Sequence, residues 1–447
     1  MSDPTNLDNR VVLKDVDVEY AHNDPNEVIE LVIGNMPTPI PVFRPAIYAT
    51  ALRAHTITIN RHWAHPSWEV LIRTPLPFTR HLQLIDVHRG GNQHLVIGAH
   101  TDFDNLFPSL TNLRITNLSL PWSTLTLPSG LIVLDIDIHD LVPAHSVQSP
   151  PELEPCHSIP SLAQLRNILL PCTALLHLSL YGIFSSAPSI VFSPPGPIHL
   201  PSLKYLSLGG NGAPIDALIR SLSVPSLTKV YIASSTWSAI RAVPLLTSQM
   251  GLSSLHPPKL AIIDAGPPYS LTRPSIFFTI MCKPSPVIIT LECIDTTTDQ
   301  WFHMVTCCGV QGIERLAVRD RSATYPFIRP PSPLPWYNIT STIVNVKEVQ
   351  LLDGSRWADA LSAVVFRQEQ HMWPLLRVID FKVEDGVDRE DVVCMSRWLM
   401  RIRESGREVI VNIRGDRVNG TNIQPLLLGL PDFALSAFRD WLSGNGS

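Results

Sequence analysis

The chain has 447 residues, of which 45% are hydrophobic and 16% are charged. This composition excludes a disordered chain, because disorder goes with low hydrophobicity and high charge. The 34 basic and 39 acidic residues give a formal net charge of −5, so no strong positive field attracts a phosphate backbone. We therefore expect no nucleic-acid partner.

The apolar runs of the sequence are short and end in proline, aspartate or glycine. None reaches the ~18 residues that cross a bilayer, so we expect no membrane partner. The first residues, MSDPTNLDNR, lack the basic and then apolar pattern of a secretory signal. Seven cysteines are odd in number and too sparse for a disulfide framework in a chain of this length. These features predict a cytoplasmic or nuclear protein.

Residues 1–80 are predicted to form an irregular N-terminal cap. From residue 81 to residue 406 one pattern recurs, Leu-x-x-Leu-x-Leu, often preceded by Pro-Ser. The clearest copy is the stretch PSLKYLSLGGN at residues 201–211, which is the opening of a leucine-rich repeat. The copies begin at Leu110, Leu131, Leu175, Leu203, Leu227, Leu260, Ile313, Val346 and Leu376.

Each copy has the alternation of a short β-strand, in which every second side chain lies on the same face. One repeat cannot bury its own apolar face, so successive repeats must stack to make a core. The leucine three positions before the strand is expected to pack its turn against the core. Asn211, and Asn117 less regularly, are predicted to satisfy backbone groups in the bend after the strand.

Segments with helical periodicity lie between the strands, at residues 161–170, 214–222, 357–373 and 389–405. A last amphipathic segment, residues 433–442, belongs to a predicted C-terminal cap over residues 407–447. Alternating strands and helices imply a parallel sheet with helices on its outer side. The predicted fold is an α/β leucine-rich-repeat solenoid, a curved parallel sheet with outer helices.

The residues on either side of the second leucine of each repeat point away from the core, and stacking aligns them on a concave face. Tyrosine and arginine, which are enriched at protein interfaces, occur among them. Tyr181, Tyr205 and Tyr231 are expected to form one patch. The predicted partner-binding residues are Asn112, Arg114, Asp135, Asp137, His177, Tyr181, Tyr205, Lys229, Tyr231, Arg315, Arg319, Glu348, Asp380 and Lys382.

Other motifs give no catalytic, cofactor or metal assignment. The sequence GGNG at residues 209–212 follows a strand but lacks the Gly-Lys-Ser/Thr of a phosphate loop, so we interpret its glycines as turn residues. His55, His62 and His65 have no cysteine or carboxylate at zinc-ligand spacing. Cys307 and Cys308 are adjacent and form no C-x-x-C motif, and no Gly-x-Ser-x-Gly occurs.

Three phrases, FPSLTNLRI, LPSLKYLSL and VPSLTKVYI, resemble the leucine-rich-repeat half of fungal F-box proteins. The resemblance covers roughly residues 80 to 400. It implies a repeat solenoid that recognises the substrates of a cullin-type ubiquitin ligase. Members of this family begin with a helical F-box that binds the adaptor subunit of the ligase.

The nearest match to an F-box start is PNEVIELVI at residues 25–33, where Asp24 replaces the leading leucine. Pro37, Pro39 and Pro41 interrupt the place of the next helix. The F-box is therefore predicted to be degenerate or missing.

Three hypotheses on function follow. The first is a non-enzymatic protein-interaction module that recruits targets to a ubiquitin ligase through its adaptor. The second is a repeat scaffold with no link to a ligase. The third is an enzyme whose site combines distant residues, with Asp135, His139 and His177 as its only candidates.

Overall fold

The computed structural model consists of two compact units, Met1–Leu227 and Thr228–Ser447. Each unit is described by itself below. The residues that the structure describes are 10–14, 28–33, 45–61, 73–86, 102–118, 120–138, 160–183, 196–210, 212–234, 245–246, 248, 250, 259–270, 273–282, 287–294, 312–320, 342–352, 373–383 and 409–415.

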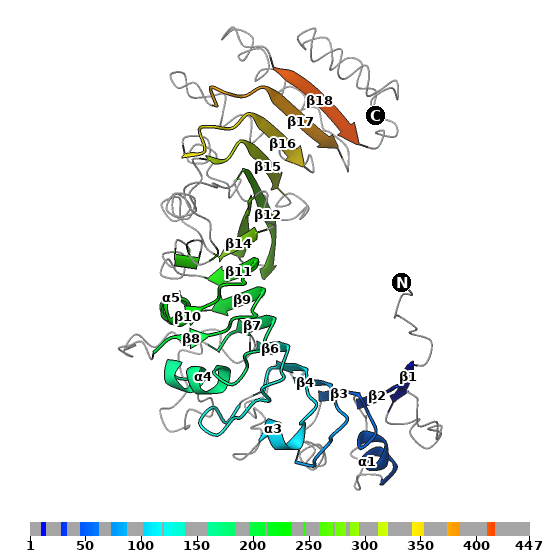
Figure 1. Cartoon of the computed structure of the whole chain (residues 1–447). Coiled ribbons are helices and arrows are strands. Elements are labelled where there is room, and N and C mark those ends of the chain that lie inside the picture. The colour runs from blue at the N-terminus through cyan, green and yellow to red at the C-terminus, as the bar shows by residue number, and fades with distance from the viewer. Residues whose placement is uncertain are drawn as a thin grey trace, which may run out of the picture. The chain divides into compact units, whose positions relative to one another are not determined.

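The first unit contains a parallel sheet whose strands follow one another in chain order (Figure 1). Its order is β1 (Arg10–Lys14), β2 (Val28–Ile33), β3 (Thr56–Arg61), β4 (His81–Asp86), β5 (Asn112–Thr116), β6 (Val133–Asp137), β7 (His177–Tyr181) and β9 (Tyr205–Gly210). Two short strands, β8 (Ile198–His199) and β10 (Leu222–Ser223), pair in parallel with each other. The predicted boundary at residue 80 falls between β3 and β4, which pair directly in parallel.

The apolar alternation of the repeats places two rows of buried side chains on one face of this sheet. Leu113, Leu134, Leu178 and Leu206 are cross-strand neighbours in one row, and Ile115, Ile136, Leu180 and Leu208 form the other. All eight are at most 1% exposed. This burial confirms the predicted core positions of these strands. Full burial of one leucine or isoleucine side chain stabilises a fold by about 1.5–3 kcal/mol. The opposite face of the sheet carries the residues that were predicted for the concave, partner-binding face. In each unit we call it the outward face.

A β-turn precedes the repeat strands β5, β6, β7, β9, β11 and β17 and explains the recurrent Pro-Ser. The N–H of the first leucine donates to the carbonyl three residues earlier, for example Leu110 to Phe107 at 2.9 Å and Leu203 to Leu200 at 3.3 Å. Proline fits the second position of such a turn because its φ is already fixed near the required value. The first leucines, Leu110, Leu131, Leu175, Leu203 and Leu227, are at most 2% exposed.

The same turn occurs twice before the first predicted copy. The N–H of Thr79 donates to Leu76 O at 3.2 Å, and the N–H of Ala54 donates to Ala51 O at 3.2 Å. Both residues are fully buried, and Thr79 Oγ1 also donates to Ala54 O at 3.2 Å. Alanine and threonine therefore occupy the leucine position ahead of β3 and β4.

The bends after β5 and β7 use the left-handed backbone region. Asn117 has φ 57° and Gly182 has φ 65°, a region that asparagine and glycine enter most readily. The N–H of Asn117 donates to Asp137 O at 2.6 Å, and the N–H of Gly182 donates to Gly209 O at 3.0 Å. The prediction that Asn117 lies in the bend is confirmed, whereas Asn211 lies outside the described residues.

Helices cover the apolar side of this sheet at several points (Figure 1). They are α1 (Pro45–Ala51), α3 (Phe103–Leu106), α4 (Leu162–Leu169) and α5 (Gly212–Ser221). α4 and α5 confirm the helices predicted at residues 161–170 and 214–222. α4 buries Leu162, Leu165, Ile168 and Leu169, which lie on one stripe of its surface.

Ser161 caps α4, and its replacement by alanine is expected to lower the free energy of unfolding by about 1 kcal/mol. Ser161 Oγ accepts from Gln164 N at 3.2 Å, and Gln164 Oε1 accepts from Ser161 N at 2.8 Å, which is a complete capping box. Urea denaturation of the full chain measures the change. Ser109→Ala, at an exposed turn serine, is the control and should change stability by less than about 0.5 kcal/mol.

The second unit has the strand order β11 (Lys229–Ser234), β14 (Val287–Ile294), β13 (Arg273–Cys282), β12 (Leu260–Ser270), β15 (Arg315–Asp320), β16 (Glu348–Leu352), β17 (Val378–Val383) and β18 (Ile410–Gly415). β12, β15, β16, β17 and β18 pair in parallel, each with the next in this order (Figure 1). The chain thus belongs to the α/β class with mostly parallel strands. β18 pairs with β17, beyond the predicted repeat boundary at residue 406.

One strand corrects the prediction of an all-parallel sheet. β13 is antiparallel to both β12 and β14, and β14 rather than β12 is the neighbour of β11. Two residues separate β12 from β13, and four separate β13 from β14. Connections this short join antiparallel strands, because a parallel crossover needs a dozen or more residues.

The helices predicted within residues 357–373, 389–405 and 433–442 lie outside the described residues, apart from Trp373 in the turn before β17. Among the described residues, no helix has the length and apolar character needed to cross a membrane.

Candidate functional site

The outward face of the first unit brings predicted residues of neighbouring repeats into register. Arg114 lies opposite Asp135, and Asp135 lies opposite Ser179. Arg114 Nε donates to Asp135 Oδ2 at 2.8 Å. The two residues are 21 positions apart in the sequence, so this ion pair forms only because β5 and β6 pair side by side. An exposed pair of this kind contributes about 0–1 kcal/mol, so its side chains add little to the fold.

His177 and Tyr205 form an aromatic stack one row away from this ion pair. They are cross-strand neighbours, and their ring centroids lie 4.2 Å apart with 29° between the planes. Burial lowers the pKa of His177; Asp135 opposes this shift, and Arg114 adds to it. Burial therefore favours the neutral imidazole of His177.

The lowered pKa of His177 predicts a loss of stability at mildly acidic pH. As pH falls below the ordinary value of about 6.5, the unfolded chain takes up this proton before the folded chain does. The contribution is complete above about pH 6.5 and declines as pH falls toward the lower folded pKa. Urea denaturation between about pH 8 and pH 5 should show a steeper loss for the wild type than for His177→Gln. Parallel pH profiles would contradict the assignment.

Tyr181 lies across the neighbouring strand and is held there by a hydrogen bond. Its hydroxyl accepts from Ser207 Oγ at 2.9 Å. Gly209 is the cross-strand neighbour of Tyr181, and a Cβ at that position would overlap the tyrosine ring. Gly209 thus lies within β9 and leaves room for this ring, which corrects its interpretation as a turn residue.

Tyr181 and Tyr205 are on the same face but at different levels. Tyr205 is level with His177, and Tyr181 is level with Gly209, four positions further along the strands. That separation is about 13 Å along the strand direction. Ser179 and Ser207, which are buried, lie between the two levels. Tyr231 belongs to the second unit, where it lies opposite Thr290.

The other predicted residues of the first unit extend the same rows. Asn112 lies opposite Val133, which is opposite His177, while Asp137 lies opposite Tyr181. Asn112 and Asp137 are both half-buried. The predicted residues Asn112, Arg114, Asp135, Asp137, His177, Tyr181 and Tyr205 therefore occupy one outward face.

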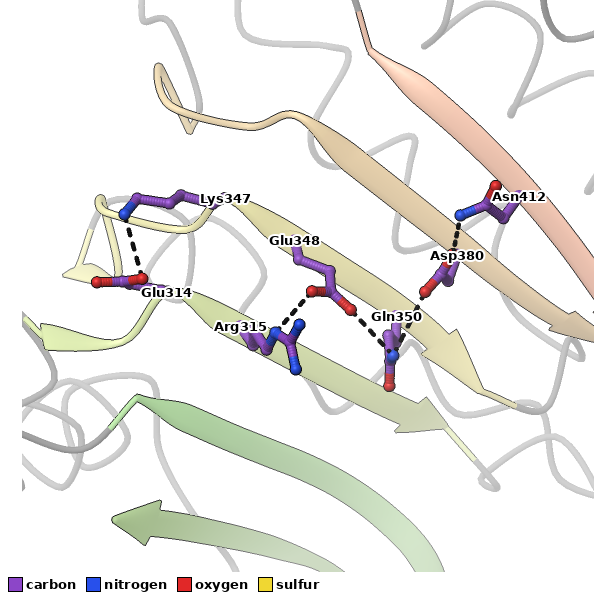
Figure 2. Close-up of polar contacts among 7 residues, drawn as sticks. All are labelled: Glu314, Arg315, Lys347, Glu348, Gln350, Asp380 and Asn412. Carbon is purple, nitrogen blue, oxygen red and sulfur yellow. Dashed lines mark hydrogen bonds and ion pairs between the residues drawn. The ribbon is translucent and has the colours of Figure 1, made fainter. Parts of the chain in front are cut away.

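The outward face of the second unit contains a continuous line of polar contacts over four strands, which Figure 2 shows. Arg315 Nε donates to Glu348 Oε2 at 2.7 Å. Gln350 Nε2 donates to Glu348 Oε1 at 3.2 Å and to Asp380 Oδ2 at 3.4 Å. Asn412 Nδ2 donates to Asp380 Oδ1 at 2.6 Å. We call these five residues, Arg315, Glu348, Gln350, Asp380 and Asn412, the polar ladder.

A second contact set lies where the strands begin. Glu314 accepts from Lys259 Nζ and, at 3.1 Å, from Lys347 Nζ, so one carboxylate joins the starts of β12, β15 and β16. The hydrogen bonds from Lys259 and then Lys347 lower the pKa of Glu314. Lys259 and Glu314 are 55 residues apart in the sequence, so the repeat pattern alone could not predict this contact.

Asn412 was missed because it lies in the predicted C-terminal cap. The signal for it was the alternation Ile410-Val411-Asn412-Ile413, which is that of a strand with one polar outward residue. Of the remaining predicted residues, Lys229 lies opposite Ile288, Arg319 opposite Leu352, and Lys382 opposite Arg414.

The described residues include no group of three or more His, Cys, Asp or Glu side chains placed to hold a metal ion. His62, His65, His139, Cys307 and Cys308 lie outside the described residues. Cys172 is fully buried, and burial, with a smaller effect of Asp104, raises the pKa of its thiol to about 12. That pKa keeps the thiol protonated and unreactive at neutral pH.

No protein-family model matches the sequence, and the searches of curated proteins and of solved structures found no significant match.

Proposed function

We propose that the chain is a leucine-rich-repeat solenoid that acts as a non-enzymatic protein-interaction module. The supporting observation is the outward face, where polar side chains of successive repeats contact one another across strands while the opposite face is buried. Stacked repeats characteristically use such extended surfaces for binding. The partner would contact the predicted residues of these faces, with arginine and tyrosine as the main anchors.

The link to a ubiquitin ligase rests on the resemblance to fungal F-box proteins. In that version the module recognises substrates and an N-terminal F-box holds the adaptor. Val28–Ile33, the nearest match to an F-box start, forms strand β2 between β1 and β3. An F-box is helical, so this conformation favours the second version, a repeat scaffold with no link to a ligase.

Affinity purification of the tagged full chain from its native cell type, followed by mass spectrometry, tests both versions. Adaptor and cullin subunits in the eluate would support the ligase receptor. A reproducible partner without them would support the scaffold. Recovery of no specific partner would contradict the interaction module itself.

Two outward-face variants then test where the partner binds. Tyr205→Ala changes the first unit, and Arg315→Ala changes the second. At least one should reduce partner recovery about tenfold, since truncating an interface anchor costs about 1–2 kcal/mol. Ser109→Ala, in an exposed turn, is the control. Unchanged recovery with both outward variants would place the partner elsewhere and contradict the proposal.

A further inference from the structure

A row of cationic side chains follows the strand starts of the second unit. Lys259, Lys347 and Arg377 each precede the first residue of a strand, and Arg315 is the first residue of β15. Backbone hydrogen bonds join neighbouring members of this row. The carbonyl of Lys347 accepts from the N–H groups of Arg377 and Val378 at 2.8 and 3.1 Å. We call Lys259, Arg315, Lys347 and Arg377 the basic row.

The basic row presents its cations outward and keeps its carboxylates closer to the sheet. The side chain of Arg315 is 59% exposed, while that of its partner Glu348 is 17% exposed. Lys259 and Lys347 are 46% and 44% exposed, while Glu314 between them is 35% exposed. Arg377 is exposed, and the ion pairs between described residues do not include it. More positive than negative charge is therefore exposed along the basic row, where a partner could contact it.

The unused hydrogen-bond donors and acceptors of this surface also favour an anionic ligand. Both oxygens of Glu314, Glu348 and Asp380 accept a hydrogen bond or ion pair from within the sheet. The contact of Arg315 with Glu348 goes through Nε, and a guanidinium has further N–H donors on its two outer nitrogens. Each lysine ammonium likewise has three donors. The six oxygens of these three carboxylates are engaged, while guanidinium and ammonium donors remain for a ligand.

Exposed apolar side chains accompany the basic row. Ile410 is 63% exposed, is the cross-strand neighbour of Val378, and donates its N–H to Arg377 O at 2.8 Å. Leu375 and Val344, in the turns before β17 and β16, are 46% and 42% exposed. A ligand that contacted the row would therefore meet both donors and apolar surface.

We propose that the basic row binds an acidic protein segment that carries apolar side chains between its carboxylates. This inference rests on the proposed function, because it names the chemistry of the partner. Carboxylates of such a segment would take the remaining donors of Arg315 and Arg377, and its apolar side chains would cover Ile410 and Leu375. The net charge of −5 disfavours nucleic acid, which is attracted by extended positive fields.

The size of the segment follows from sheet geometry. The row crosses four neighbouring strands, β12, β15, β16 and β17. At ~4.8 Å per strand this is about 15 Å, which about five extended residues span. A short linear segment is thus sufficient, and a peptide is a suitable probe.

The test is fluorescence anisotropy with the purified full chain and a labelled peptide of about twelve residues built from Glu-Leu-Glu units. We expect saturable binding that weakens as salt rises from about 50 to 300 mM. Arg377→Ala should weaken binding about tenfold, and Ile410→Ser should weaken it several-fold. Arg80→Ala is the matched control, because Arg80 is an exposed arginine that precedes strand β4 in the first unit. It should leave the affinity unchanged.

Three results with the peptide would overturn the inference. They are the absence of saturable binding up to about 0.5 mM protein, equal binding of a peptide with lysine in place of glutamate, and equal loss in Arg377→Ala and Arg80→Ala. Binding of a DNA oligonucleotide of equal charge as tight as that of the peptide would also overturn it. A co-purified partner that is lost with Tyr205→Ala but retained with Arg377→Ala would remove this inference and leave the interaction module intact.

Discussion

Replacing Phe107 with alanine is expected to lower the free energy of unfolding by about 3–5 kcal/mol. Phe107 is fully buried, and its ring stacks on Phe103 with centroids 5.6 Å apart and 30° between the planes. Its carbonyl also accepts from Leu110 N in the turn before β5. Alanine would leave a cavity where helix α3 meets this turn. Urea denaturation followed by circular dichroism measures the loss.

Phe78→Ala is the matched control for this change. Phe78 is in the equivalent turn before β4, but its side chain is 57% exposed. Its replacement should change stability by less than about 0.5 kcal/mol. Equal losses for the two phenylalanines would contradict the repeat core of the first unit.

Replacing Val349 with aspartate is expected to cost more than about 4 kcal/mol and to unfold the second unit under mild conditions. Val349 is fully buried on β16, between Leu316 of β15 and Ile379 of β17. A carboxylate there would lose its hydration and meet no cation. Urea denaturation together with limited proteolysis would detect the change.

Val344→Asp tests the same substitution at an exposed position. Val344 lies in the turn before β16 and is 42% exposed. We expect a change within about 0.5 kcal/mol. A loss at Val349 no larger than that at Val344 would contradict the burial of this face of β16.

The sequence predicted the repeat strands β5, β6, β7 and β9 well, because leucine fills their first position. Leu110, Leu131, Leu175 and Leu203 are all buried as expected. The copy predicted at Leu260 was out of register, since Leu260 is the first residue of β12 and lies opposite Arg315. The repeat of β3, before residue 81, was missed because Ala54 takes the leucine position, and Thr79 takes the same position ahead of β4. Alanine and threonine can occupy it because the position requires burial and a turn hydrogen bond, and the hydroxyl of Thr79 finds its acceptor in Ala54 O.

The residues of the outward face could be predicted in part. Alternation alone placed Arg114, Asp135, Arg315, Glu348 and Asp380 opposite the core. Their partners could not be read from the sequence, because a contact between repeats depends on cross-strand register. The contacts of Lys259 and Lys347 with Glu314, and the contact of Asn412 with Asp380, can be assigned only when that register is known.

The reversed strand β13 has a consequence for synthesis on the ribosome. A solenoid of strictly ordered strands can extend its sheet as each repeat emerges, but β11 must wait for β14, which ends about sixty residues later. At ~5–20 residues per second this delay is about 3–12 s. During that interval β12 and β13 can pair as a hairpin, while the edge of β11 that β14 will take is open to a chaperone or to another chain. Translation order and spatial order therefore diverge over residues 229–294 of the nascent chain.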